Sequence, residues 1–169
     1  QNSSDTPTTN NHDPLSSPTP QAKSSVNATL YPQLTHLKLS HCSIGELSGL
    51  QTRILGTFTN LKSLSLAHND LTQSSTALAV LQSLPLLEHL DLSYNQLESF
   101  EDACLQLGGQ LKTLKLTGNQ IASVKGGLDK LYSLQTLWLD YNRIESIGSM
   151  ASLANLPDLK NLKLWGNPF

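Results

Sequence analysis

The sequence has few cysteines and few charges, and each scarcity argues against a class of protein. Its 169 residues contain two cysteines, Cys42 and Cys104. Small secreted domains depend on dense disulfides, so this count favours a reducing, cytoplasmic compartment. Only 14% of the residues are charged and the formal net charge is −2. Nucleic-acid binders carry a basic footprint, so we expect no nucleic acid as a partner.

Long apolar runs and catalytic motifs are also missing. No stretch of about 18 apolar residues occurs, so we expect no membrane-spanning segment. The sequence contains no serine elbow, no H-E-x-x-H, no P-loop and no C-x-x-C motif. We therefore expect a non-catalytic protein without a cofactor. An enzymatic function would require a catalytic domain outside this sequence.

The first 29 residues differ in composition from the rest. They are rich in Ser, Thr, Asn and Pro, and Leu15 and Val26 are nearly their only large apolar side chains. Such a segment cannot bury enough apolar surface to offset its conformational entropy. We predict a disordered Ser/Thr/Pro-rich linker over residues 1–29. Residues 30–169 are expected to form the folded domain, truncated at its C-terminus because the last residues stop within a repeat.

From Leu34 onward a nine-residue unit, L-x-x-L-x-L-x-x-N, recurs. Its middle leucine falls at positions 37, 64, 90, 114, 137 and 162. A unit of this form with a spacing of about 25 residues is typical of leucine-rich repeats. We predict an α/β leucine-rich-repeat solenoid of about six repeats, with a curved parallel β-sheet on its concave face. Short helices and turns are expected on the convex face.

The leucines and the final asparagine of the unit have separate structural roles. L-x-L is expected to be a short strand whose leucines point into the core, because side chains of a strand alternate between its faces. The asparagine amide can bond to backbone groups that the next turn leaves unpaired, and stacked copies would form a ladder. We expect Cys42 to occupy this place, pointing inward, in the first repeat. A disulfide from Cys42 to Cys104 is not expected, because two strand spacings alone separate their repeats by about 10 Å.

The connections between the strands are expected to be short. Apolar clusters predict helices within residues 70–84, 101–107 and 148–156, and the glycine-rich stretch 125–128 predicts one tight turn. No cap is evident at either end of the stack. Because each repeat contacts only its neighbours, we expect the fragment to be less stable than its parent protein.

Side chains at the x positions of the strands point into the concave face and are not needed by the core. Both tryptophans lie there, in adjacent repeats, and we expect them to be close enough to touch. Exposed aromatic rings beside cations are typical of a binding hot spot. The alternative is that a further repeat covers Trp165 and makes it part of the core. The predicted partner-binding residues are Trp138, Trp165, Tyr141, Asp140, Lys115, Lys163, Tyr94, Asp91, His89 and His68.

Four of the five histidines also occupy outward positions, namely His36, His41, His68 and His89. His41 and His68 share a column in adjacent repeats, but no third metal ligand is evident beside them. We therefore expect no metal site and interpret these histidines as a polar, pH-sensitive contact surface.

The repeats resemble the short-repeat class of intracellular leucine-rich-repeat proteins, whose unit ends in N-x-I-x-x-I. The matching segments here are Asn119–Val124 and Asn142–Ile147. Within this class the chain is most similar to nischarin-like scaffold proteins. That similarity covers residues 30–169 in colinear order and includes Leu34–His41, Leu90–Asn95 and the K-L-Y-S-L segment Lys130–Leu134.

This resemblance implies a cytoplasmic or endosome-associated scaffold that engages small GTPases, Ser/Thr kinases and integrin tails. Nischarin-like proteins carry a lipid-binding phox-homology domain before the repeats, whereas a polar linker precedes them here, so lipid binding is not implied. We expect a small GTPase or a Ser/Thr kinase as the partner on the concave face. The alternatives are a regulatory subunit of a protein phosphatase, because the short-repeat class includes one, and an extracellular receptor ectodomain.

Overall fold

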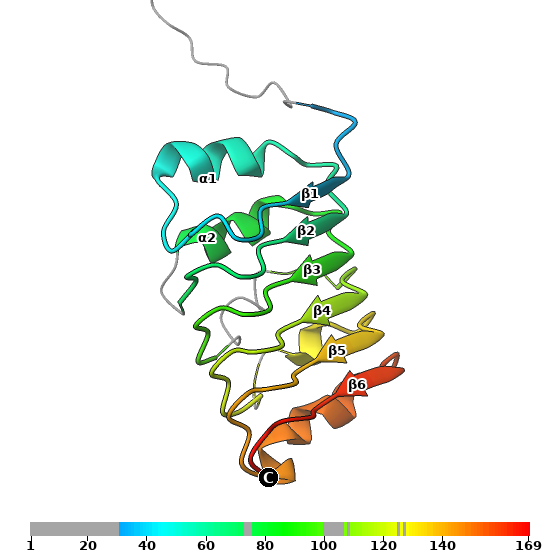
Figure 1. Cartoon of the computed structure of the whole chain (residues 1–169). Helices are drawn as coiled ribbons and strands as arrows, with labels where there is room; N and C mark the ends of the chain where they lie inside the picture. The colour runs from blue at the N-terminus through cyan, green and yellow to red at the C-terminus, as the bar shows by residue number, and fades with distance from the viewer. Residues whose placement is uncertain (1–30, 73–75, 100–106, 108, 125, 127) are drawn as a thin grey trace, which may run out of the picture.

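Six short parallel strands form one sheet in the computed structural model, which describes residues 31–72, 76–99, 107, 109–124, 126 and 128–169. The strands follow one another across the sheet in sequence order (Figure 1). This is the arrangement that the repeat pattern predicts. The strands are β1 His36–Lys38, β2 Ser63–Ser65, β3 His89–Asp91, β4 Thr113–Lys115, β5 Thr136–Trp138 and β6 Asn161–Lys163.

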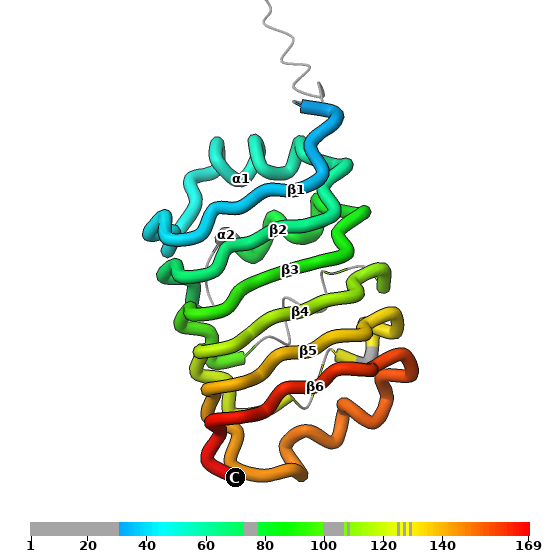
Figure 2. Tube along the Cα trace, turned by 45° about the vertical axis from the view of Figure 1, so that its right-hand side comes forward, coloured from blue at the N-terminus to red at the C-terminus, as the bar shows by residue number. Residues whose placement is uncertain are grey.

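The register of the sheet places equivalent positions of successive repeats side by side. Leu37 pairs with Leu64, and the same alignment continues through the middle leucine of every later repeat. The trace in Figure 2 shows the result, a coil whose successive turns stack on one another. The predicted solenoid of six repeats is therefore confirmed.

Helical segments lie on the side of the coil away from the strands. Residues 70–84 contain the predicted helix, as a short α-helix α2, Thr76–Ala79, followed by a 3-10 turn η1, Val80–Ser83. The predicted helix in residues 148–156 is a 3-10 segment, η3 Ile147–Asn155, kinked at Met150. In the glycine-rich stretch the 3-10 turn η2 covers Leu128–Lys130. Apart from Leu107, the helix predicted at 101–107 lies outside the described residues.

One helix in the first repeat, α1 Gly49–Gly56, has no counterpart in the prediction. A capping box starts it: the Gln51 amide donates to Ser48 Oγ, 3.3 Å away, and the Ser48 amide donates to Gln51 Oε1, 2.8 Å away. The S-x-x-Q spacing of this box is visible in the sequence. The apolar pattern beside it is weak, because none of the α1 side chains is buried. No helix in the described part of the chain is long and apolar enough to cross a bilayer.

The core is a column of leucines that is complete only in the middle of the stack. Leu64, Leu90, Leu114 and Leu137 are at most 2% exposed. At the ends, Leu37 is only partly buried and the equivalent Leu162 of β6 is 41% exposed. The gradient arises because a repeat is covered only by its neighbours.

The predicted asparagine ladder is present. Asn69 Oδ1 accepts hydrogen bonds from the amides of Cys42 and Ile44, each at 3.0 Å. Its Nδ2 group donates to the carbonyl of Leu39 in the preceding repeat, at 2.8 Å, and to that of Leu66 in its own repeat, at 2.9 Å. The other ladder asparagines also join their own repeat to the preceding one, and they are Asn95, Asn119, Asn142 and Asn167.

The expectation that Cys42 points inward is wrong. Its side chain is an exposed free thiol whose Sγ lies 3.4 Å from the Ser40 carbonyl. An asparagine in this slot bonds to the preceding repeat, and β1 is the first strand of the described residues. Among the described residues the slot at Cys42 therefore has no earlier turn to pair, so no contact seen there requires an amide. Cys104 lies outside the described residues, so the prediction about the disulfide stays a prediction.

Candidate functional site

The outward face of the sheet carries a hollow of about 840 Å³, here called the concave hollow, to which all six strands contribute side chains. Nine of the ten residues predicted to bind a partner line it, and Trp165 does not. The nine are Trp138, Tyr141, Asp140, Lys115, Lys163, Tyr94, Asp91, His89 and His68. The sheet register brings them together, because each occupies an outward or turn position of its repeat.

A row of charged and aromatic side chains crosses β3 to β6 at one register position. Asp91, Lys115, Trp138 and Lys163 pair in this order across the sheet. Lys115 Nζ lies 3.9 Å from Asp91 Oδ2 and 4.3 Å from the centroid of the Trp138 ring. Lys163 Nζ lies 3.8 Å from the same centroid. Lys115 and Lys163 therefore flank Trp138 on its two sides along the row.

A second row, of aromatic rings, lies at the turns that follow β1, β2 and β3. The rings of His41 and His68 stack with centroids 4.2 Å apart, and those of His68 and Tyr94 stack at 4.3 Å, both pairs tilted by 14°. All three residues have left-handed backbones, with φ of 58°, 54° and 56°. The shared conformation turns each side chain in the same direction, so the rings align. The sequence shows the column, but neither the stacking nor the part that His41 takes in it was predicted.

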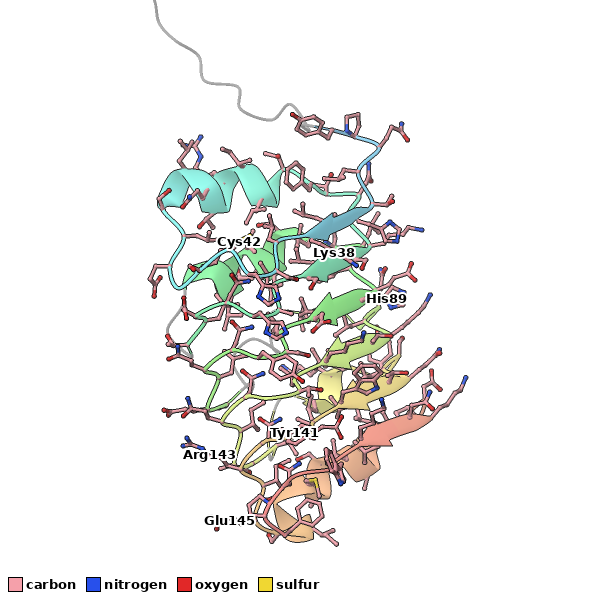
Figure 3. All side chains as sticks on the ribbon, viewed as in Figure 1. Lys38, Cys42, His89, Tyr141, Arg143 and Glu145 are labelled. Carbon is pink, nitrogen blue, oxygen red and sulfur yellow. The ribbon has the colours of Figure 1, made fainter. Side chains whose placement is uncertain are left out.

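Glycine occupies the same turn position in the fourth and sixth repeats because a ring lies over it. Gly118 and Gly166 have φ of 70° and 74°. A Cβ atom on Gly118 would lie 2.6 Å from Cδ1 of Tyr94, and one on Gly166 would lie 2.6 Å from Cδ1 of Tyr141. The tyrosine rings therefore need glycine in the next repeat. Figure 3 labels Tyr141, with Arg143 and Glu145 farther along the chain and away from the strands.

The two tryptophans have different partners, and the expected contact between them is not among the ring contacts of the described residues. Trp165 is 72% exposed and meets Tyr141 edge-on, with centroids 4.7 Å apart. Asp140 is only 9% exposed, and its Oδ1 accepts the Trp165 amide at 2.9 Å. Asp140 therefore fixes the backbone that presents Trp165, in addition to lining the concave hollow.

The floor of the concave hollow consists of small polar and apolar side chains. Ser40 and Ser65 share a hydrogen bond of 3.0 Å, and Ala67 and Ser93 are buried beside the ring row. Oγ1 of Thr117 is buried and has no hydrogen-bond partner among the described residues. Buried hydroxyl groups are usually paired, so this atom stands out, and nothing in the sequence distinguishes it from the neighbouring Ser and Thr residues.

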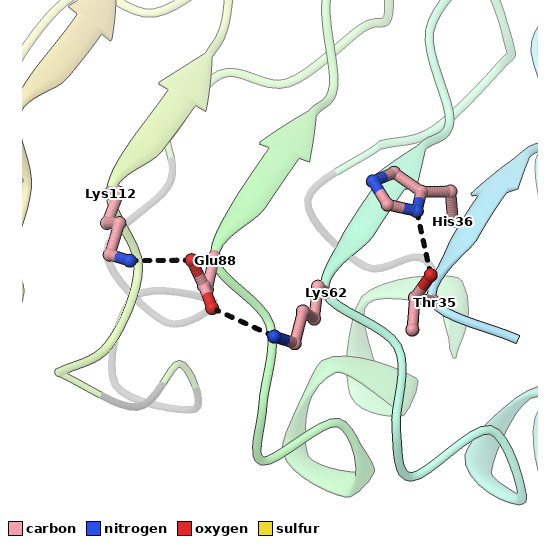
Figure 4. A network of polar contacts seen from close by, with 5 residues as sticks. All are labelled: Thr35, His36, Lys62, Glu88 and Lys112. Carbon is pink, nitrogen blue, oxygen red and sulfur yellow. Dashed lines mark hydrogen bonds and ion pairs between the residues drawn. The ribbon is translucent and has the colours of Figure 1, made fainter. Parts of the chain in front are cut away.

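The histidines do not converge on a common point. In the described part of the chain no three His, Cys, Asp or Glu side chains are grouped so that they could hold a metal ion. His41 and His68 face each other as stacked rings. His36 Nδ1 lies 2.9 Å from Thr35 Oγ1 at the exposed start of β1 (Figure 4).

A separate ion-pair network lies just before the strands, outside the concave hollow. Glu88 Oε2 is 2.6 Å from Lys112 Nζ, and its other oxygen is 3.8 Å from Lys62 Nζ (Figure 4). The hydrogen bond from Lys112 lowers the pKa of Glu88 below its ordinary value, and the charges of Lys112 and Lys62 act in the same direction. The network joins three successive repeats along their edge.

Comparison with known proteins places these features in a family. The family model described as "Leucine rich repeat" matches residues 60–121, and that described as "Leucine Rich repeats (2 copies)" matches residues 110–151. Internalin C2 of Listeria monocytogenes superposes with a TM-score of 0.64 at 30% identity, over 79% of this chain and 52% of that chain. The leucine-rich-repeat domain of APL1B gives a TM-score of 0.64 at 23% identity, covering 78% and 36%, and supports the fold alone.

Three relatives are similar in sequence over most of the chain. CD180 antigen of Mus musculus is 31% identical over 151 residues, which are 85% of this chain and 22% of that protein. The alpha subunit of human geranylgeranyl transferase type-2 is 38% identical over 111 residues, covering 66% and 18%. Human serine/threonine-protein kinase 11-interacting protein is 37% identical over 108 residues, covering 64% and 10%. The chain thus spans less than a quarter of the length of each relative. With six repeats in register, an asparagine ladder and these matches, it belongs to the leucine-rich-repeat family.

Proposed function

We propose that this chain is a non-catalytic scaffold module that binds a signalling protein, a small GTPase or a Ser/Thr kinase, through the concave hollow. Domains of the leucine-rich-repeat family are generally protein-interaction modules. The observation that carries the proposal is that the concave hollow gathers ionic and aromatic side chains that take no part in the leucine core. Aromatic and cationic side chains of this kind are enriched in interface hot spots.

The kind of partner rests on two similarities. One relative is named as a kinase-interacting protein, and this favours the kinase. From the resemblance to nischarin-like scaffolds we also propose a small GTPase as a partner and a cytoplasmic location in association with endosomes. Both the nischarin-like relationship and this location belong to the proposal. The tests below address the binding surface and the partner.

Affinity capture from cytosol with the full chain tests the proposal. The bait is compared with the double variant Trp138→Ala/Trp165→Ala, which truncates the two outward tryptophans. Tyr132→Ala serves as a matched control, because Tyr132 is also an exposed ring, 59% accessible, but does not line the concave hollow. We expect a GTPase or kinase to be retained by the wild-type and control baits and lost from the double variant.

Two results would count against the proposal. A partner retained equally by a well-folded double variant would place the interface elsewhere. A phosphatase catalytic subunit captured in place of a GTPase or kinase would favour a phosphatase regulator. Circular dichroism melting of each bait establishes that the loss of a partner does not follow from unfolding.

A further inference from the structure

Three neighbouring strands present an unusual group at the C-terminal end of the concave hollow. Lys115 of β4, Trp138 of β5 and Lys163 of β6 are register partners and form what we call the lysine–tryptophan cluster. The two ammonium groups lie 4.3 and 3.8 Å from the centroid of one indole ring. The ring attracts both cations through its quadrupole, so it holds two like charges near each other.

The positive charge of this cluster is only partly balanced. Lys115 has Asp91 at 3.9 Å, whereas in the described part of the chain no carboxylate lies within ion-pair distance of Lys163. The other carboxylate lining the hollow, Asp140, is 9% exposed and already accepts the Trp165 amide. Three lysines and two aspartates line the hollow as a whole, Lys38 included, so one ammonium group is in excess there. Concave surfaces of this kind concentrate the electrostatic field. An anion placed near the two lysines would relieve their mutual repulsion.

The surroundings of the cluster suit an extended polypeptide. Tyr94 and Tyr141 are half-exposed along the rim and offer apolar contact area. The floor between them contains small side chains, including Thr117, whose buried hydroxyl has no partner among the described residues. A main chain can lie close to such a floor. The rings beside it can accept an apolar side chain.

We propose that the lysine–tryptophan cluster binds the side-chain carboxylate of an aspartate or glutamate in an extended acidic segment of the protein partner. This inference rests on the proposed function, since it names the chemistry that the same hollow recognises. An apolar residue next to the carboxylate packs on Tyr141. Trp138 acts as a positioning residue that holds the two ammonium groups in place. A nucleic acid is disfavoured, because the chain has a formal net charge of −2 and so lacks the basic footprint that a phosphate backbone requires.

A peptide-display selection on the full chain tests this proposal, with an unbiased linear library as the probe. The affinity of a selected peptide is then measured by fluorescence polarisation for the wild type and for Lys115→Gln/Lys163→Gln. Lys38→Gln is the matched control, because Lys38 also lines the hollow but belongs to β1, at the far end of the sheet. Melting curves of all three proteins verify their folding.

We expect the selected peptides to be enriched in Asp and Glu beside an apolar residue. The double variant should weaken binding about tenfold, as two partly exposed charge contacts together allow, and Lys38→Gln should change it less than about twofold. Replacing the peptide's Glu by Gln should weaken binding to the wild type but not further weaken binding to the double variant. Raising the salt concentration should weaken the wild-type complex more than the variant complex.

Different failures have different meanings. Selected peptides that lack acidic enrichment but still compete with one another for the hollow would overturn the carboxylate site and leave the protein-binding function standing. Equal affinity of wild type and double variant for an acidic peptide would also overturn it. A library that yields no binder sensitive to Tyr94→Ala or Tyr141→Ala would overturn the acidic-segment proposal, whereas the protein-binding function is decided separately by the affinity capture. Tighter binding of a single-stranded oligonucleotide than of the peptide would overturn the proposal, because it would make a nucleic acid the partner instead of an acidic polypeptide.

Discussion

At the scale of single residues, position in the stack decides what a side chain contributes. The middle leucines occupy identical places in the nine-residue unit, yet Leu114 is fully buried and Leu162 is 41% exposed. The free energy that a leucine contributes depends on the apolar area it removes from water. Leucines at equivalent positions of the repeat therefore contribute different amounts to the free energy of unfolding.

Replacing Leu114 by Ala should lower the free energy of unfolding by about 2–5 kcal/mol, because it leaves a cavity in the packed middle of the core. Leu162→Ala should cost less than about 1.5 kcal/mol, since much of the lost surface is already exposed. Urea denaturation of the two variants measures the difference. Equal losses would contradict the burial gradient.

Among the described residues, Glu88 is a carboxylate whose protonation in acid should lower the stability of the stack. Its pKa is lowered from the ordinary 4.5 by the hydrogen bond from Lys112. A carboxylate with a depressed folded-state pKa stabilises the fold at pH values above 4.5, and this contribution is lost as the pH falls through the folded value. We expect Glu88→Gln to be less stable than the wild type at pH 7, and the two to converge as the pH falls from 4.5 through the lower pKa of the folded state. The urea denaturation midpoints of both proteins across this pH range provide the measurement. A difference in midpoint that grows in acid would contradict the stabilising role of ionised Glu88.

At the scale of elements, the strands and the helices were predictable to different degrees. The leucine spacing was sufficient to locate all six strands, because their pattern repeats in register. α1 was missed because its apolar face is weak, although its capping box was visible. The orientation of Cys42 was predicted wrongly because an inward side chain at this position is held by bonds to the preceding repeat. The stack of His41, His68 and Tyr94 depends on backbone dihedrals and ring orientations, which a single sequence does not specify.

α1 should depend on its cap more than on its packing. Ser48→Ala removes the hydroxyl that accepts the Gln51 amide and should destabilise α1 by about 1 kcal/mol. Ser48→Asp retains an N-cap acceptor and is the control. Hydrogen exchange of residues 49–56 should accelerate in the alanine variant alone, with β3 to β5 unaffected. Faster exchange throughout the sheet would show that α1 stabilises the whole stack.

At the scale of the whole molecule, the solenoid is a linear array whose ends are more open than its middle. Leu34, Leu37 and Leu39 at the first repeat and Leu159 and Leu164 at the last are only partly buried. We therefore expect amide protection to be highest in β3 and β4 and to decrease toward β1 and β6, since terminal repeats lack a covering neighbour on one side. Hydrogen-exchange mass spectrometry resolves the six strands, and uniform protection would indicate that they open as one unit.

The asparagine ladder gives the array a direction. The turn after each of the strands β1 to β5 is completed by an amide that is encoded one repeat later, as Ile44 is by Asn69 and Ile144 is by Asn167. Chain growth from the N-terminus would therefore leave the newest turn open until the following asparagine arrives. Shortening the array from its C-terminal end breaks bonds that an earlier turn needs. Removing the first repeat instead leaves an asparagine side chain with fewer backbone partners, but it opens no remaining turn. The two ends of the array should therefore differ in how well they tolerate removal of a repeat.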